Sequence, residues 1–312
     1  MTTHPPDLAT SPIDRTPVGK ARHLLHEGET LAEGLRRFVV AEIAAARVEL
    51  TDPALPRDEA IHRTRRHLKR VRSLFTVLEP VPGADRENRI RRIRDTARLL
   101  AGARDADVVA AEARRLHAQS HGAAERAAGR LAERLEAAVA VAHSATPPIE
   151  EIAARLRASE ASARSLPTRF EAGRLLADAL VETYRRGRRD WREIEDGTSV
   201  AALHDWRKRV KARRHLSALV PIPTAVTGRS ILSDLEQLGE ILGEEHDLAV
   251  LRHRLEDDPA LLGSGEGRDD VLDLVARRRR RLKKDALELG GDLYDLRTRA
   301  FAHELEALRE LC

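Results

Sequence analysis

Two stretches of this sequence decide the expected fold: residues 61–74 read IHRTRRHLKRVRSL, and residues 203–216 read LHDWRKRVKARRHL. They align without a gap, so each position of the first has an equivalent 142 residues later. The same offset aligns LAGARDADV at 100–108 with LGEEHDLAV at 242–250. In both halves 43 residues separate the motif histidine from the motif aspartate. Chance does not keep two motifs in register over such a distance, so the sequence indicates an internal repeat.

Basic side chains share one face of each of these two predicted helices. At 100° per residue they fall within about 120° of one another, and apolar residues occupy the neighbouring sector. We call the two sets the basic rows. The first basic row consists of His62, Arg65, Arg66, Lys69 and Arg72, and the second of His204, Arg207, Lys208, Lys211 and Arg214.

Each basic row predicts a surface for an anionic partner. Like charges four residues apart on one helix face destabilise the helix, and an anion removes that repulsion. A single row is commonly only a solvated face, since long cationic side chains cover apolar surface. Solvent exposure, however, gives no reason for both halves to keep the same order of histidine and basic residues. Each histidine taken alone could be a partly buried or capping residue, but within the row we expect it to donate a hydrogen bond to an anionic oxygen.

Composition indicates an all-α protein. The 312 residues are 42% hydrophobic and 34% charged but only 3% aromatic, and they lack the alternating runs that strands require. The single cysteine, Cys312, excludes a disulfide framework and a cysteine-based zinc site. No apolar run approaches the length of a membrane span, so we expect a cytoplasmic protein that does not bind membranes. The 55 Lys and Arg exceed the 51 Asp and Glu by only four, so the placement of the charges matters more than their sum.

The repeat defines the expected domain organisation. Residues 1–28 are rich in proline and without helical periodicity, which predicts a disordered lead-in. We assign residues 29–165 to a first helical repeat and residues 166–312 to a second. The expected fold is two helical bundles related by a pseudo-twofold axis, forming one compact unit with a basic central channel.

The ordered motifs resemble those of the CHAD family, the conserved histidine α-helical domain. The matching patterns are H-x-x-[RK]-[RK]-x-x-K-x-x-R in both halves, L-x-G-x-R-D-x-D-V in the first and L-G-x-x-H-D-x-x-V in the second, together with YRRGRR at 184–189 and the run 276–301. The resemblance covers about residues 29–312. It implies a compact all-α protein with two pseudo-symmetric bundles, whose basic inner surface binds inorganic polyphosphate.

Two departures from the family pattern bear on the site. The first glycine motif has Ala101 after its leucine, and the second half has His246 where the first has Arg104. The two halves therefore need not contribute equally to binding.

Further residues are weaker candidates for the site. Asp105 and Asp247 recur at equivalent places, and we interpret them as groups that orient an arginine or cap a helix, because a free carboxylate would repel the ligand. The run RRRRRLKK at 277–284 must cover every helix face, so we expect it to be solvated with one or two members reaching the ligand. The additional polyphosphate-binding candidates are Arg37, Arg104, Tyr184, Arg185 and Arg188.

Two other functions stay open from the residues alone. Dispersed cations suit a nucleic-acid backbone, although no helix-turn-helix context is readable and aromatic residues for base stacking are scarce. The dipeptide His246-Asp247 is compatible with a metal-dependent phosphohydrolase, although a metal needs three or four ligands and the basic rows would repel it. No phosphate-binding loop is present, and the E-x-E-x-K signature of the triphosphate tunnel domain that sometimes accompanies this family is missing.

We therefore predict a binding protein with no catalytic residue, no metal and no cofactor. The predicted partner is inorganic polyphosphate, with nucleic acid as the weaker alternative. Association with polyphosphate granules and formation of homo-oligomers are left open.

Overall fold

The structure, a computed structural model, describes residues 25–197, 201–262 and 267–311. The predicted lead-in lies outside these residues up to position 24. The described ranges contain helices and no strand, which confirms the all-α class. In chain order the elements are α1 (Leu31–Leu50), α2 (Arg57–Val77), α3 (Arg86–Leu99), α4 (Ala101–Gln119), α5 (Gly122–Ser144), α6 (Ile149–Arg164), α7 (Ala172–Glu195), α8 (Ala201–Ser217), α9 (Arg229–Asp257), the 3₁₀ helix η2 (Pro259–Leu262), α10 (Arg268–Leu293), α11 (Thr298–His303) and α12 (Glu306–Arg309).

The helices begin where the local sequence favours it. Thr30 and Glu33 form a capping box at the start of α1: the Thr30 hydroxyl accepts from the Glu33 amide at 3.3 Å, and the Glu33 carboxylate accepts from the Thr30 amide at 2.9 Å. α2 follows Pro56 and carries Asp58 and Glu59 in its first turn, where the helix dipole favours negative charge.

The helix boundaries follow the 142-residue offset. α7 and α8 begin and end within three residues of α1 and α2 shifted by 142. Shifted in the same way, α3 and α4 together cover the span of the single helix α9, and α5 overlaps α10. The halves differ at their ends, since two short helices, α11 and α12, stand where the shift places α6. That a twofold axis relates the halves stays a prediction.

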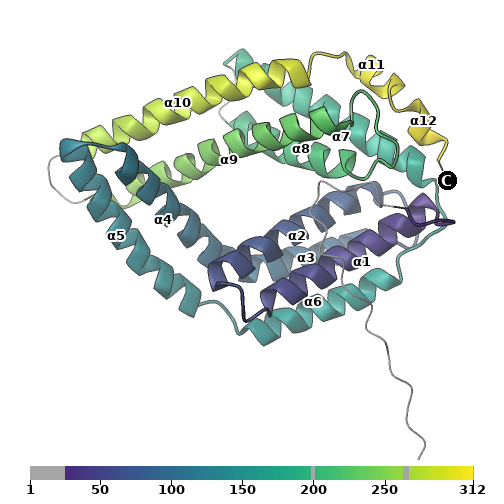
Figure 1. The fold of residues 1–312 in the computed structure, drawn as a ribbon, viewed down its shortest axis with the longest axis horizontal. Coiled ribbons are helices and arrows are strands. Elements are labelled where there is room, and N and C mark those ends of the chain that lie inside the picture. Colours follow the sequence, from purple (N-terminus) through teal and green to yellow (C-terminus); the bar gives the residue numbers. More distant parts are fainter. Residues whose placement is uncertain (1–24, 198–200, 263–266, 312) are drawn as a thin grey trace, which may run out of the picture.

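Two hydrophobic cores hold the helices together, and each takes residues from both halves. The larger core joins α1, α2, α3 and α6 to α7, α8, α11 and α12, and also takes in the first turns of α9 and the last turns of α10. The smaller core joins α4 and α5 to the far parts of α9 and α10. Figure 1 shows α4 and α5 reaching from the lower bundle to the ends of α9 and α10 at the left. The predicted repeats are therefore packed as one unit, while their exact boundary stays a prediction.

A buried arginine fixes α8 within the second half. Arg213 is 1% exposed, and its Nη1 donates to the backbone oxygen of Leu293 at 2.8 Å. Its guanidinium carbon lies 4.9 Å from the ring centre of Tyr184, 5.3 Å from that of Tyr294 and 5.2 Å from that of Phe301. A desolvated cation is stabilised by such aromatic faces. This arginine lies between Lys211 and Arg214 of the second basic row in sequence but faces the core.

We expect Leu68→Ala to destabilise the fold by about 2–5 kcal/mol, because the α2 side chain is buried and the loss leaves a cavity. The measurement is the free energy of unfolding in urea. Thr76→Ala on the same helix is the matched control, since Thr76 is exposed and its loss should cost little. Equal losses in the two variants would contradict the assigned core face.

Candidate anion-binding site

The two basic rows lie on α2 and α8, and these helices contact each other. The Ser73 hydroxyl and Nδ1 of His215 are 3.0 Å apart and share a hydrogen bond. These two residues are equivalent positions of the repeat, 142 residues apart. Burial, followed by the charges of Arg70 and Arg214, lowers the pKa of His215 to about 3, so this imidazole is neutral at physiological pH. The helices α2 and α8 therefore meet along a seam where equivalent positions of the repeat face each other.

The central lysines of the rows, Lys69 and Lys211, face the same region. Desolvation by the surrounding protein, then the charges of Arg65 and Arg207, lowers the pKa of Lys69 to about 8. Desolvation, then the charges of Arg207 and Lys69, lowers the pKa of Lys211 to about 7. Lys69 is nevertheless exposed to solvent. Lys69 therefore lies at the surface and not in the core, close enough to the other cations for their charges to act on it.

Arg104 joins the two rows from α4. Its charge lowers the pKa of His62 and of Lys69 in the first row and that of Arg207 in the second. In each case desolvation is the larger cause. The structure therefore brings this weaker candidate to the place where α2, α4 and α8 meet.

The outer ends of the rows differ between the halves. In the second half the rings of His204 and His246 lie 4.8 Å apart, centre to centre. In the first half the position equivalent to His246 is Arg104, which acts on His62. Burial, then the charge of Arg207, lowers the pKa of His246 to about 4, so the ring is neutral and keeps one N–H to donate. The sequence carried a signal for His246, because it is the equivalent of Arg104, but it was not among the predicted site residues.

Two aspartates stand beside the arginines of the rows. Asp105 raises the pKa of Arg65, and Asp247 raises that of Arg207, although desolvation lowers both more strongly. Burial raises the pKa of Asp247 itself, while the charges of Arg207 and Arg104 lower it. Both aspartates lie inside helices, α4 and α9, so the capping interpretation is wrong. Their placement instead partly offsets the positive charge of the nearest arginine.

The arginines next to these aspartates are held close to the helices that follow. Nη1 of Arg65 donates to the backbone oxygen of Ala97 on α3 at 2.7 Å. Nη2 of Arg207 would lie 3.7 Å from a Cβ on Gly243, the glycine of the second L-G motif. The guanidinium thus lies at van der Waals distance from α9 at this glycine.

The remaining members of the rows are charged groups near the surface. Lys208 forms an ion pair with Asp205 at 2.8 Å, and Arg214 forms one with Glu236. Arg66 is exposed, and its charge lowers the pKa of Arg214 across the seam, after desolvation. Arg72 is exposed at the end of the first row. The structure therefore gathers all ten row members on the two neighbouring helices.

Other predicted residues are not brought to the rows. Tyr184 is 1% exposed, its hydroxyl donates to the backbone oxygen of Leu296 at 2.7 Å, and its ring stacks on Phe301 at 3.9 Å. It belongs to the core, so its assignment to the ligand site is wrong. Arg188 donates from Nε to the backbone oxygen of Tyr294 at 3.0 Å.

Two surface arginines among the predicted residues pair with acids of their own bundle. Arg37 pairs with Glu29 at 2.7 Å, and this contact lowers the pKa of Glu29 to about 2. Arg185 pairs with Glu182 at 2.8 Å. Neither contact connects to the rows, so we leave Arg37 and Arg185, with Arg188, outside the candidate site.

The dense basic run on α10 is paired as well as solvated. Arg278 pairs with Glu244 at 2.7 Å, and Arg279 pairs with Glu245 at 2.6 Å, both on α9. Lys284 is exposed and pairs with Glu288 at 3.6 Å. The ion pairs of Arg278 and Arg279 join α10 to α9, so these two arginines hold the helices together. Lys284 pairs within α10 itself.

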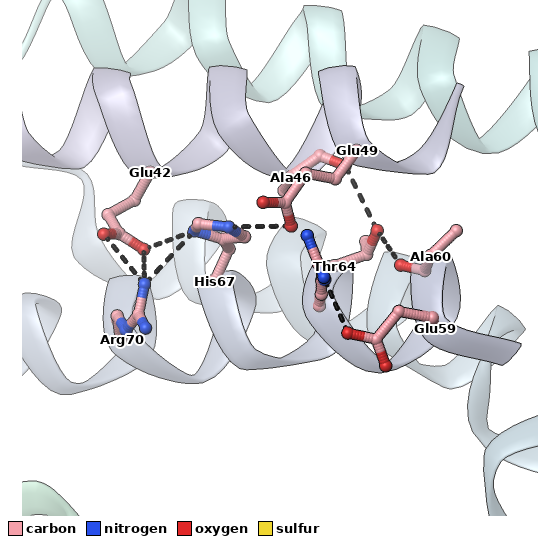
Figure 2. Close-up of polar contacts among 9 residues, drawn as sticks. Glu42, Ala46, Glu49, Glu59, Ala60, Thr64, His67 and Arg70 are labelled. Carbon is pink, nitrogen blue, oxygen red and sulfur yellow. Dashed lines mark hydrogen bonds and ion pairs between the residues drawn. The ribbon is translucent and has the colours of Figure 1, made fainter. Parts of the chain in front are cut away.

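A second polar cluster fastens α2 to α1, and the charge of its Arg70 also contributes to the lowered pKa of Arg214, for which desolvation is the largest cause. Figure 2 shows His67 between two carboxylates of α1: Nδ1 lies 2.7 Å from Glu42, and Nε2 lies 3.1 Å from Glu49. Arg70 also pairs with Glu42, at 3.1 Å. His67 and Arg70 lie in the same motif, residues 61–74, as the first basic row. Their contacts with α1 fix the orientation of α2 and therefore of that row.

Among the described residues, no group of three or more histidine, cysteine or acidic side chains is placed to hold a metal ion. In the same residues, no helix combines the length and the apolar character needed to cross a bilayer.

Comparison with known proteins identifies a family and solved structures with a similar fold. The family model for the CHAD domain matches residues 40–256. A solved structure, described as the crystal structure of the CHAD domain from the plant Ricinus communis, is similar with a TM-score of 0.57 and 20% identity, over 91% of this chain and 95% of that chain. No curated protein matches this chain.

We expect Lys69→Gln to raise the pKa of Lys211, because the charge of Lys69 is one of those that lower it. An NMR titration of the lysine side chains measures this, and the sequence holds only six lysines to assign. Lys284→Gln is the matched control, since it removes an exposed lysine on α10 that pairs with Glu288. An unchanged pKa of Lys211 in Lys69→Gln would mean that the two rows do not meet.

Proposed function

The chain belongs to the CHAD domain family, whose model matches residues 40–256, and on this premise we propose that it binds inorganic polyphosphate along the two basic rows and catalyses no reaction. The observation that carries the proposal is the convergence of cations from α2, α4 and α8 on one region. There, after desolvation, the charges of Arg65, Arg207 and Arg104 lower the pKa of Lys69, and the charges of Arg207 and Lys69 lower that of Lys211. Such a concentration of like charge favours a ligand that brings many negative charges.

The chemistry of polyphosphate matches this region. The ligand carries about one negative charge per phosphate and no bases, so its recognition requires cations and no aromatic platform. Guanidinium groups can grip phosphate oxygens with two parallel hydrogen bonds, and lysine acts as a point charge. The guanidinium groups come from Arg65, Arg104 and Arg207, and the point charges come from Lys69 and Lys211. Neutral His62 and His246 each keep an N–H for an anionic oxygen.

The use of lysine at the centre of the rows supports the same proposal. Only six of the 55 basic residues are lysine, yet lysine stands at both equivalent central positions, 69 and 211. Arginine stays charged at every physiological pH, whereas a crowded lysine can release its proton. The empty site lowers its internal repulsion in this way, and a bound polyanion restores both charges. Granule association, a cytoplasmic location and oligomer formation remain predictions that follow from the proposed ligand.

We expect Lys69→Glu and Lys211→Glu each to weaken binding of long-chain polyphosphate by about tenfold or more, because each reverses a charge at the centre of the site. Titration at two salt concentrations measures the affinity, which should fall steeply with salt. Lys284→Glu makes the same change on α10 and should leave affinity nearly unchanged, and circular dichroism checks that every variant is folded.

Three results would contradict the proposed function. One is unchanged affinity in both central variants. Another is displacement of polyphosphate by duplex DNA at equal phosphate concentration and physiological salt, which would favour nucleic acid. The third is release of phosphate from polyphosphate by the purified protein with Mg²⁺ or Mn²⁺, lost in His62→Ala, which would replace binding by catalysis.

Affinity should also fall as the pH rises from about 6 to about 9. In the free protein Lys211 loses its charge around pH 7 and Lys69 around pH 8, while binding favours the charged form of both. Binding at pH 8 should therefore take up protons, which calorimetry in buffers of different ionisation enthalpy detects. The double variant Lys69→Arg with Lys211→Arg keeps its charge across this range and should lose both the pH dependence and the proton uptake. The same pH dependence in that variant would assign it to other groups.

A further inference from the structure

The two halves carry opposite charge on the helix that follows each row. Residues 86–98, in α3, hold six arginines and two acids, a net charge of +4. The equivalent residues 228–240, at the start of α9, hold one arginine and three acids, a net charge of −2. The apolar positions still correspond, since Ile93 aligns with Leu235 and both are buried. The repeat has thus kept the packing face and reversed the charge on the rest of the helix.

This reversal falls at the ends of the two rows. Arg72 ends the first row, and its neighbour on α3 is Arg94, whose charge lowers the pKa of Arg72 after desolvation. Arg214 ends the second row, and its neighbour on α9 is Glu236, with which it forms an ion pair. Arg94 and Glu236 are equivalent positions, 142 residues apart. One end of the site therefore continues in positive charge, and the other meets a carboxylate.

Exposure makes both neighbours accessible to a ligand. Arg94 is exposed and has no ion-pair partner among the described residues, whereas Arg98 on the same helix pairs with Asp95 at 3.0 Å. The side chain of Glu236 is 48% exposed and that of Arg214 is 22% exposed. A second carboxylate, Glu240, raises the pKa of Arg214 further, although desolvation lowers it more strongly.

Resting on the proposed function, we propose that a long polyphosphate chain leaves the site on one side only: it continues past Arg72 over α3 through Arg94, and it stops at Arg214, which Glu236 occupies. Arg94 is then a further binding residue for long chains. Glu236 is an internal anion that competes with the ligand for Arg214 and repels the phosphates beyond it. A short polyphosphate, held at the central lysines, uses neither residue.

Exchanging the two residues between the halves tests this proposal. The measured quantity is the ratio of the affinity for long-chain polyphosphate to the affinity for triphosphate, at physiological ionic strength. Arg94→Glu should lower this ratio about tenfold, and Glu236→Arg should raise it about tenfold, because one removes and the other adds a contact that only long chains reach. Arg94→Gln and Glu236→Gln should move the ratio in the same directions by smaller factors, which keeps the test valid if a reversal variant fails to fold.

The controls change exposed charged residues away from the rows. Glu256→Arg breaks the ion pair of Glu256 with Arg252 near the end of α9, and Arg155→Glu breaks that of Arg155 with Glu151 on α6. Both should leave the ratio unchanged. The proposal is overturned if the exchange variants change the ratio no more than these controls do. A wild-type protein that binds neither ligand would instead refute the proposed function, so the two failures are distinguishable.

Discussion

Repulsion among the cations of α2, α4 and α8 is the constraint on which the rest of the structure depends. Lys69, Lys211, Arg104 and Arg207 lie close enough for their charges to lower the pKa of a neighbour. For the two lysines the folded pKa lies below the usual value of 10.5, so their charged forms destabilise the fold up to about pH 7 and this cost disappears as the pH rises toward 10.5. The scaffold must hold these groups together against that repulsion.

The architecture supplies this support from outside the site. In one hydrophobic core α2 and α8 pack against helices of both halves, and in the second core α4 packs against α9 and α10. Between them, the His67 contacts fix α2 to α1, and buried Arg213 fixes α8 among the aromatic residues of its bundle. The polar residues of α2 and α8 thus lie on different faces with different roles. His67 and Arg213 anchor their helices within the bundles, and the basic rows lie on the faces toward the seam.

The halves share their packing and differ in their charges. Arg104 in one half corresponds to His246 in the other, and Arg94 corresponds to Glu236. Burial restricts the apolar positions because a cavity or a buried charge is costly, whereas surface charges are free to change without loss of the fold. A repeat can therefore keep one architecture and acquire two unlike ends of a single site.

Local periodicity and the internal repeat were enough to predict the helical class and to assign each basic row to a helix. They suffice because helix formation and the face on which a residue lies depend on neighbours within a few positions. Only the tertiary structure decided which residues each polar side chain contacts. It placed Tyr184 in the core and paired Arg214 with Glu236. It also brought Arg104 of α4 close to both basic rows. The physical reason is that the partner of a helix face comes from a distant segment, and no local pattern states which segment that is.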